Sequence, residues 1–388
     1  MLESAIAHTN LPNSVAAGTS LGRQITTQFN GEPPDALILF ASPCYDYAEL
    51  LQAIASSCQP RIMIGCSSAG EFTSAVPQEG STCALALRST EIHFAAGIGR
   101  NLRSNPSAAV QELTASFEGI AAHDYVYHSA LVLTDALAGQ TDQFIEQLTL
   151  RTAGAYQFFG GGAGDDARFQ HTHVFCGTQA VSDAVVALEI LSNKPLGIGV
   201  CHGWQPASAA MRVTDSEGMC LIGVNAIPAV EIFEEHAETT KQRFDLADPL
   251  PFFLHNVIGI DSGDGYKLRV PLGVDADGSI PCAVDIPVGS SIQIMRTTGD
   301  SALEAAASAT STAMQQLNGH RPKVALFFDC VATRLRLGNA FGLELQAIEQ
   351  ILGSAQYVGF NTYGQIARVD GQFSGFHNCT AVVCIFPE

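Results

Sequence analysis

Basic residues are scarce in this sequence, and tryptophan is almost missing. The 19 lysines and arginines are outnumbered by 38 aspartates and glutamates, which gives a formal net charge of -19. A surface this acidic repels phosphate backbones and anionic bilayers, so nucleic acid and membrane surfaces are not expected as partners. Trp204 is the single tryptophan, whereas phenylalanine occurs 21 times. The aromatic part of any core must therefore come mainly from phenylalanine.

Long hydrophobic runs and paired cysteines are also missing. No uninterrupted apolar run reaches the roughly 18 residues of a membrane-spanning helix, and the N-terminus lacks the basic start and apolar core of a secretion signal. The 11 cysteines are odd in number and scattered, with no CxxC pair. That pattern favours reduced, buried thiols over a disulfide framework. We therefore expect a soluble, cytoplasmic protein.

Three stretches of the chain repeat one order of features. Each has an apolar strand-like run, a segment with helical periodicity, a glycine-containing turn and a second apolar run. From the opening alanine to the first glycine is roughly 29, 30 and 34 residues, which suits one strand, helix and strand. We expect the turns to line one shared cleft, although glycines that only make tight strand ends would give the same pattern. The turns are 65–71, 160–166 and 359–365.

The length of 388 residues predicts two domains. We place them at residues 34–221 and 222–386, after a loosely structured or edge-packed leader of about 30 residues. Strands and helices alternate in both, which predicts a mixed α/β class with two related lobes of β-sheets flanked by helices. An acidic helix over 225–236 and an alanine-rich helix over 302–317 are expected in the second domain.

With these motifs laid out, the chain resembles the FIST family, which combines an N-terminal and a C-terminal FIST domain. The resemblance covers almost the whole chain from about residue 34, and the two expected domains would be these two. One departure is Gln365, where the family tends to carry glutamate. The matching motifs are Gly65-Cys66-Ser67-Ser68-Ala69-Gly70-Glu71, Phe159-Gly160-Gly161 with Gly164-Asp165-Asp166, Cys330 with Arg334 and Leu337-Gly338, Gly359-Phe360-Asn361-Thr362-Tyr363-Gly364-Gln365, and Phe376-His377-Asn378.

The resemblance implies a small-ligand sensor that acts in signal transduction through other proteins. Relatives are often fused to kinase, cyclase or chemotaxis modules, and the repeats here leave no room for one. The chain thus resembles the stand-alone FIST proteins that bind haem, sense nitric oxide and regulate a partner histidine kinase. An amino acid or similar metabolite is the alternative ligand. Whether the protein forms a homodimer stays open.

The expected ligand contacts come from the turns and the matching motifs. Arg334 can hold a carboxylate or a haem propionate through its planar guanidinium. Glu71, Asp165 and Asp166 end glycine-rich turns and could hold a cationic amine, unless they merely face solvent. The full set of expected ligand-binding residues is Cys66, Ser67, Gly70, Glu71, Asp165, Asp166, Cys330, Arg334, Asn361, Tyr363 and Asn378.

A haem sensor needs an axial ligand, commonly a neutral imidazole in an apolar cavity. His255 is the candidate metal ligand because it follows Pro251-Phe252-Phe253-Leu254, although a half-buried histidine bonded to the backbone is the plainer interpretation. His202 and His377 are weaker candidates. His171 and His173 alternate as half of a metal site would, but a polar hairpin explains them equally.

A cysteine-dependent enzyme is the third alternative, with Cys66 or Cys330 as nucleophile and Arg334 as cationic stabiliser. A reactive thiol needs a depressed pKa, which no sequence pattern reveals. Neither cysteine stands at a catalytic spacing from a histidine and an acid. We therefore expect no enzymatic activity and no catalytic residues.

Overall fold

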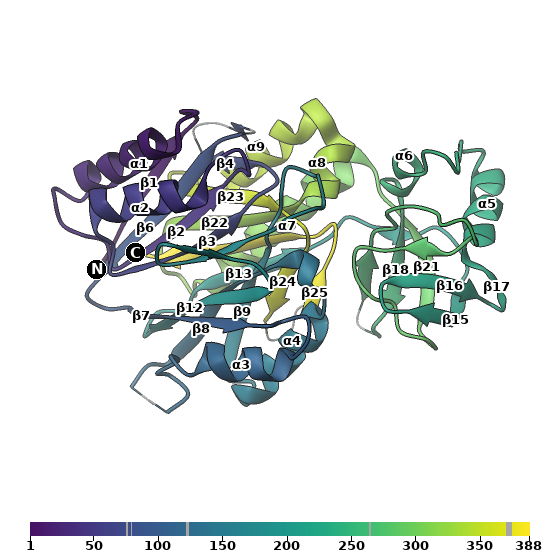
Figure 1. Ribbon diagram of the computed structural model, residues 1–388, viewed down its shortest axis with the longest axis horizontal. Coiled ribbons are helices and arrows are strands. Elements are labelled where there is room, and N and C mark those ends of the chain that lie inside the picture. Colours follow the sequence, from purple (N-terminus) through teal and green to yellow (C-terminus); the bar gives the residue numbers. More distant parts are fainter. Residues whose placement is uncertain (75–76, 79, 122–123, 264, 370–374) are drawn as a thin grey trace.

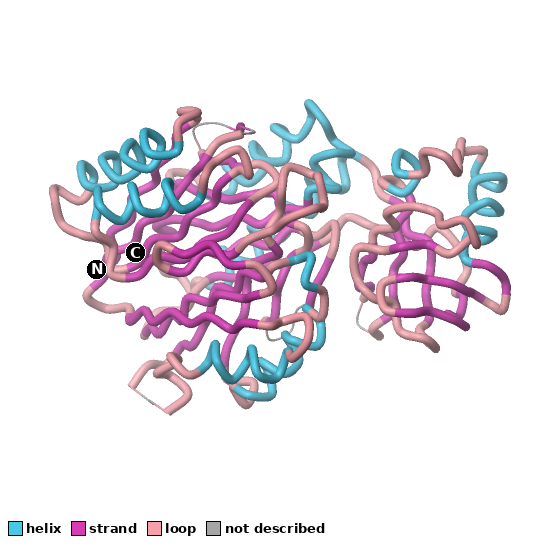
Figure 2. Tube along the Cα trace, viewed as in Figure 1, coloured by secondary structure: helices cyan, strands magenta, loops and turns pink. Residues whose placement is uncertain are grey.

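The computed structural model describes residues 1–74, 77–78, 80–121, 124–263, 265–369 and 375–388. Its body contains three six-stranded sheets, and a smaller domain of residues 205–296 stands to one side of that body (Figures 1 and 2). The expected mixed α/β class is confirmed. The internal strand, helix and strand repeats are confirmed too, and all three lie in the body.

The three sheets of the body share one strand order. In each sheet a central parallel pair has antiparallel neighbours on both sides. In matching order, the sheets are β1 (Leu2–Thr9), β6 (Thr82–Ser89), β2 (Ala36–Ala41), β3 (Ile62–Ser67), β10 (Val174–Cys176) and β11 (Gln179–Val181); β7 (His93–Arg100), β12 (Ala184–Ser192), β8 (Tyr127–Thr134), β9 (Tyr156–Gly162), β24 (Gln365–Arg368) and β25 (Gly375–His377); and β13 (Gly197–Cys201), β26 (Ala381–Pro387), β22 (Pro322–Cys330), β23 (Gln356–Thr362), β4 (Glu71–Thr73) and β5 (Pro77–Gln78).

We call each of the three repeats a unit, numbered in chain order. Each unit supplies the edge hairpin of another unit's sheet. The hairpin β4–β5 follows β3 in the chain but pairs with β23 of the third unit. In the same way β10–β11 pairs with β3 of the first unit, and β24–β25 pairs with β9 of the second. This exchange runs once around the body. It interlocks the three units, because removing any one of them leaves another sheet without its edge hairpin.

The sheets enclose one central core and carry helices on their outer faces (Figure 2). In β2, Ile38 and Phe40 point into the central core, whereas Leu37 and Leu39 point toward the helices, as strand alternation requires. The outer helices are α1 (Ser14–Gln28) and α2 (Tyr47–Cys58) on the first sheet, α3 (Pro106–Thr114) and α4 (Thr141–Arg151) on the second, and α7 (Gly299–Gln316) and α9 (Phe341–Leu352) on the third.

The smaller domain has its own sheet and its own core. Its buried Arg269 is 2% exposed and forms an ion pair with Asp142 of α4, which connects the domain to the body. The elements of the domain are β14 (Gln205–Pro206), β15 (Met211–Glu217), β16 (Cys220–Val224), β17 (Ile227–Pro228), α5 (Ala229–Thr240), α6 (Leu250–Phe253), β18 (Asn256–Asp261), β19 (Tyr266–Arg269), β20 (Ile280–Pro281) and β21 (Ser291–Arg296).

The N-terminus is more ordered than a loose leader. Residues 1–30 supply β1, an edge strand as the edge-packed alternative expected, and the outer helix α1. Residue 222, the expected boundary, lies inside β16, and the division into two domains stays a prediction. The two expected helices correspond to α5 and α7. Among the described residues, no helix combines the length and the apolar character needed to cross a membrane.

Candidate functional site at the ring of turns

The three glycine-containing turns occupy equivalent places in the three units. Each begins at a glycine in the second strand of the parallel pair, where a Cβ atom would overlap a carbonyl oxygen of the first strand. Only glycine therefore lets the two strands lie this close. The glycines and the residues whose carbonyl oxygens they approach are Gly65 and Leu39, Gly160 and Val132, and Gly359 and Phe327.

The three turns meet and are bonded to one another, whereas the shared cleft that they were expected to line stays a prediction. Their backbones form a closed cycle in which each turn is hydrogen-bonded to both of the others. We call this cycle the ring of turns. Its hydrogen bonds are Ala69 N to Asn361 O (3.0 Å), Gly164 N to Ser67 O (2.9 Å), Tyr363 N to Gly162 O (3.0 Å), Asn361 N to Gly70 O (2.8 Å), Ser67 N to His173 O (2.9 Å) and Gly162 N to Gly364 O (2.7 Å).

Glu71 follows the first turn and is buried among neutral hydrogen-bonding groups. Its Oε2 accepts from the backbone N–H and the hydroxyl of Ser81, at 3.1 and 2.9 Å, and its Oε1 is hydrogen-bonded to the Ser68 hydroxyl. Burial raises the pKa of the Glu71 carboxyl to about 8, and the hydrogen bonds lower this pKa only in part. Glu71 is therefore mostly protonated at neutral pH.

Gln365 occupies the same place in the third unit. Glu71 and Gln365 each begin a hairpin strand, and each pairs with the residue that follows the matching glycine. The Gln365 Nε2 donates to Thr362 Oγ1 at 2.5 Å, and its Oε1 accepts from Thr380 N at 3.1 Å. A primary amide has the shape and the donor and acceptor pattern of a protonated carboxylic acid. Gln365 is thus the neutral counterpart of protonated Glu71.

Asp165 organises the loop that follows the second turn. Its carboxylate accepts the backbone N–H groups of Phe169, Gln170 and His171 at 2.8, 2.7 and 2.8 Å, and it also accepts the Tyr363 hydroxyl. The Phe169 ring stacks on Tyr363, with centroids 4.3 Å apart. Asp165 and Tyr363, both expected to bind ligand, therefore hold the loop against the ring of turns.

We predict that Asp165→Asn destabilises the protein by about 2 kcal/mol, because an amide nitrogen cannot accept backbone N–H groups that now bond to a charged oxygen. Urea denaturation measures the loss. Asp46→Asn is the matched control: Asp46 caps α2 by accepting Glu49 N at 3.0 Å, and asparagine caps a helix equally well. Equal stability losses in the two variants would contradict this role of Asp165.

Asp166 differs from Asp165 because one of its oxygens is unsatisfied. Its Oδ2 accepts the Ser42 hydroxyl at 2.9 Å, while its buried Oδ1 has no partner among the described residues. Burial raises the pKa of Asp166. Beside it, Tyr47 and His173 pack their rings 5.4 Å apart, and the buried His173 Nδ1 also has no described partner. Unsatisfied buried polar atoms of this kind call for a ligand or a water.

Arg334 brings a guanidinium group to the same turns. It lies in α8 (Val331–Leu337) and donates to the backbone oxygen of Ala69. Gly70, with φ +128°, has no room for a Cβ because that atom would overlap Arg334 Nη1. Burial lowers the Arg334 pKa, and the charge of Glu71 acts in the opposite direction. The expected closeness of Gly70, Glu71 and Arg334 is what the structure has.

The remaining expected residues have mainly structural partners. Cys66 lies in the central core, where burial raises its thiol pKa well above the ordinary value. Ser67 accepts His173 N at 3.0 Å, and Asn361 Nδ2 lies 3.4 Å from Asp329 Oδ2. Asn378 accepts Val270 N of the smaller domain at 3.3 Å, away from the ring. Their place in ligand binding stays a prediction.

His255 lies apart from the ring, in the turn between α6 and β18 of the smaller domain. Its side chain is exposed. Burial of part of the ring and the charges of Arg336 and Arg296 lower its pKa, which favours neutral imidazole. Phe252 and Phe253, which the sequence suggested as walls of a porphyrin pocket, are packed inside the core of their own domain. The surroundings of His255 therefore do not fit haem.

No sequence pattern pointed to Ser42, Tyr47 or His173 as part of this site. His171 and His173 were considered as a metal pair, but they lie outside any strand, with His171 exposed and His173 half-buried. No cluster of three or more metal-ligating side chains occurs among the described residues. Ser42 directly follows β2. That topological position was the only available signal.

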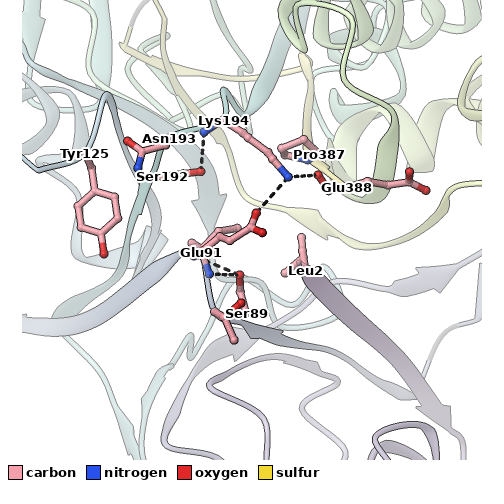
Figure 3. A pocket seen from close by; sticks show the side chains of 11 residues that line it. Leu2, Ser89, Glu91, Tyr125, Ser192, Asn193, Lys194, Pro387 and Glu388 are labelled. Carbon is pink, nitrogen blue, oxygen red and sulfur yellow. Dashed lines mark hydrogen bonds and ion pairs between the residues drawn. The ribbon is translucent and has the colours of Figure 1, made fainter.

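Two cavities of the described surface lie away from the ring. One of about 340 Å³ lies between the far ends of β6, β12 and β26 (Figure 3). In it Lys194 Nζ is 3.1 Å from Glu91 Oε2 and donates to the Glu388 backbone oxygen at 2.6 Å. A larger cleft of about 680 Å³ lies between α4 and β19 and includes Asp142 and Arg269. At the ring itself the turns are bonded directly to each other.

Two family models match the chain. The model described as the FIST N domain matches residues 35–226, and the FIST C domain matches residues 229–368. No curated protein matches the sequence. A cyanuric acid hydrolase from A. caulinodans aligns over 100% of this chain and 99% of its own, with 8% identity and a TM-score of 0.38. Phosphoribosylformylglycinamidine synthase II from Thermotoga maritima aligns over 99% of this chain and 71% of its own, with 11% identity and a TM-score of 0.23. Scores this low carry no argument about the site.

Proposed function

Because the chain belongs to the FIST family, whose domains are small-ligand sensors in signal transduction, we propose that it senses an amino acid or a similar small zwitterion at the ring of turns. The ligand would bind beside the first turn, between Asp166 and Arg334. The response would pass to a separate signalling protein such as a histidine kinase.

The unsatisfied Asp166 Oδ1 is the observation that carries this proposal. A buried acceptor without a donor costs about 1 to 3 kcal/mol, and an ammonium group supplies the missing donor together with a positive charge. Binding of a cation would also lower the raised pKa of Asp166 and favour its charged form. An amine is therefore the ligand group that this oxygen fits best.

Arg334 and Asp166 both contact the backbone of the first turn. Asp166 N donates to Ser68 O at 3.2 Å, and Arg334 donates to the oxygen of the next residue, Ala69. The two residues thus contact successive peptide oxygens of the first turn. A guanidinium binds a carboxylate in a planar, two-point geometry. An α-amino acid carries an ammonium for Asp166 and a carboxylate for Arg334.

Binding without catalysis agrees with the protonation states at the ring. Burial holds the Glu71 carboxyl largely neutral and keeps the Cys66 thiol protonated. Neither group is then a ready base or nucleophile near pH 7. We propose that the ring acts as a binding site, and the cysteine-dependent enzyme is not favoured there.

The haem and nitric oxide hypothesis stays a separate prediction from the sequence. It needs an axial ligand, and His255 is its candidate. The exposed position of His255 and the packing of its phenylalanine neighbours within their own core give it no support. Haem is therefore included in the experiment as a second arm.

The experiment is thermal unfolding across a panel of amino acids, with haemin titration followed by absorbance. A ligand at a hundred times its dissociation constant stabilises the fold by about 2.7 kcal/mol. We expect one amino-acid class to stabilise the native chain, Arg334→Gln and Asp166→Asn to lose that shift, and the exposed Arg23→Gln to keep it. A shift that survives in both ring variants would place the ligand elsewhere. A sharp Soret band that His255→Ala removes would instead support haem.

A further inference from the structure

Cys330 and Cys379 form a thiol pair that the ring of turns does not use. Cys330 is the last residue of β22, directly before α8, and Cys379 lies in the turn before β26 with φ +50°. In the antiparallel pair of β22 and β26, Phe328 lies opposite Val382, so the end of β22 lies beside the turn that holds Cys379. Both thiols belong to one buried cluster, and each is the main influence on the pKa of the other. They are 3% and 5% exposed, close to the surface of the body where the smaller domain packs.

The two thiols are electrostatically unequal. The hydrogen bond from the Cys379 thiol is the main cause that lowers the pKa of Cys330 from 9.0 to about 6, and the Ala332 N–H and the Gln365 side chain contribute in the same direction. The same bond raises the pKa of Cys379. Cys330 is thus mostly thiolate at neutral pH and Cys379 is its proton-bearing neighbour, the arrangement found in reactive dithiols.

The fold itself does not need a thiol at either position. The strand register aligns Ser42 of the first unit and Asp135 of the second unit with Cys330 of the third. Ser42 and Asp135 each lie one residue after the last pair of their two parallel strands. Gly80 and Asp183 are the corresponding equivalents of Cys379, and both also have positive φ, at +67° and +49°. Other residues therefore serve the structural role in the other units, which leaves chemistry as the reason for two adjacent thiols here.

The thiol pair lies at the contact with the smaller domain. One cluster of buried apolar residues contains both cysteines together with Trp204, Val257 and Met295 from the neighbourhood of that domain. Arg336 of α8 lies 5.6 Å above the Trp204 ring. A covalent change at the cysteines would alter packing beside the only tryptophan of the chain.

We propose that Cys330 and Cys379 are a peroxide-sensitive dithiol that closes to a disulfide at the contact between the body and the smaller domain. The Cys330 sulfur attacks one oxygen of hydrogen peroxide, the O–O bond breaks, and the released hydroxide takes a proton and becomes water. The Cys330 sulfenic acid is then attacked by the Cys379 sulfur. Its hydroxyl leaves as a second water with the Cys379 proton, so the dithiol loses two electrons and the peroxide gains them.

The test uses the reduced full chain titrated with hydrogen peroxide. Remaining thiols are alkylated and mapped by mass spectrometry, and Trp204 fluorescence is followed in parallel. We expect a Cys330–Cys379 disulfide at least 10-fold faster than oxidation of the exposed Cys44 or the buried Cys384, with a rate that rises with pH around a midpoint near 6. Dithiothreitol should restore the fluorescence.

Three variants make the outcome decisive. Cys330→Ser should fold, because Ser42 stands in the equivalent place, and should lose both the disulfide and the fluorescence change. Cys379→Ser should stop at a sulfenic acid on Cys330 that dimedone traps. Cys44→Ser should behave as the native chain. The proposal is overturned if Cys44 or Cys384 reacts as fast as Cys330, or if the fluorescence change persists in Cys330→Ser. Neither result bears on ligand binding at the ring.

Discussion

Gly160→Ala is expected to destabilise the protein by about 3 kcal/mol or more, the largest effect of any single methyl group that we predict. The added Cβ would overlap the backbone oxygen of Val132, and the residue has φ +140°, which L side chains rarely adopt. Overpacking costs about 1 to 3 kcal/mol, and the backbone strain adds to it. Because Val132 belongs to the adjoining parallel strand, neither atom can move away without breaking the sheet.

Two further glycines give this prediction a graded control, measured by urea denaturation. Gly65→Ala creates the same overlap with Leu39 but has no positive φ to strain, so its cost should be smaller. Gly342 lies in α9 with open space around its Cα, and alanine there should stabilise by about 0.5 to 1 kcal/mol. If Gly160→Ala were as stable as Gly342→Ala, the close strand approach would be wrong.

Glu71→Gln is expected to stabilise the protein by about 2 to 3 kcal/mol at pH 7. Folded Glu71 keeps its proton up to about pH 8, whereas in the unfolded chain the group ionises near its ordinary value of 4.5. Between these values the folded state binds more protons than the unfolded state. Stability from Glu71 is therefore fully present below about pH 4.5 and is lost as the pH rises toward about 8. Glutamine, already used at position 365, carries no such proton.

The measurement is the free energy of unfolding of both proteins from pH 5 to 9. The native protein should lose stability across this range relative to Glu71→Gln, and the difference should level off above about pH 8. The reverse change, Gln365→Glu, should introduce a second loss of the same sign. The exposed Glu235→Gln in α5 serves as the matched control and should leave the pH profile unchanged. A constant difference at every pH would show that Glu71 does not titrate in this range.

The glycines of the ring could be predicted from the sequence, because the steric requirement that places them acts between neighbouring strands of one repeat. A glycine is required wherever two parallel strands approach too closely for a Cβ, and Gly65, Gly160 and Gly359 mark that requirement at similar spacings. The same repeats placed Glu71 and Gln365 at equivalent points, and strand register agrees with this alignment. Local backbone sterics leave a trace in the sequence.

The partners of these residues were not foreseeable in the same way. The sequence treated Asp165 and Asp166 as a pair, yet Asp165 is saturated by its own loop and Asp166 has an unsatisfied oxygen. The phenylalanines beside His255 in the sequence suggested a haem pocket. In the structure their rings pack inside the core of the smaller domain. The residues next to a side chain in the sequence do not show which of its atoms find partners in the folded protein.

The sequence alone determined the class, the three repeats and the glycines that end their strands, since strand alternation and backbone crowding act over a few residues. Only the tertiary structure decided that each repeat lends a hairpin to another, that three turns close into a ring, and that Cys330 meets Cys379 across 49 positions of chain. Those outcomes depend on which distant surfaces bury each other. The free energy of the whole fold decides which surfaces pack together, and no short sequence pattern indicates the result.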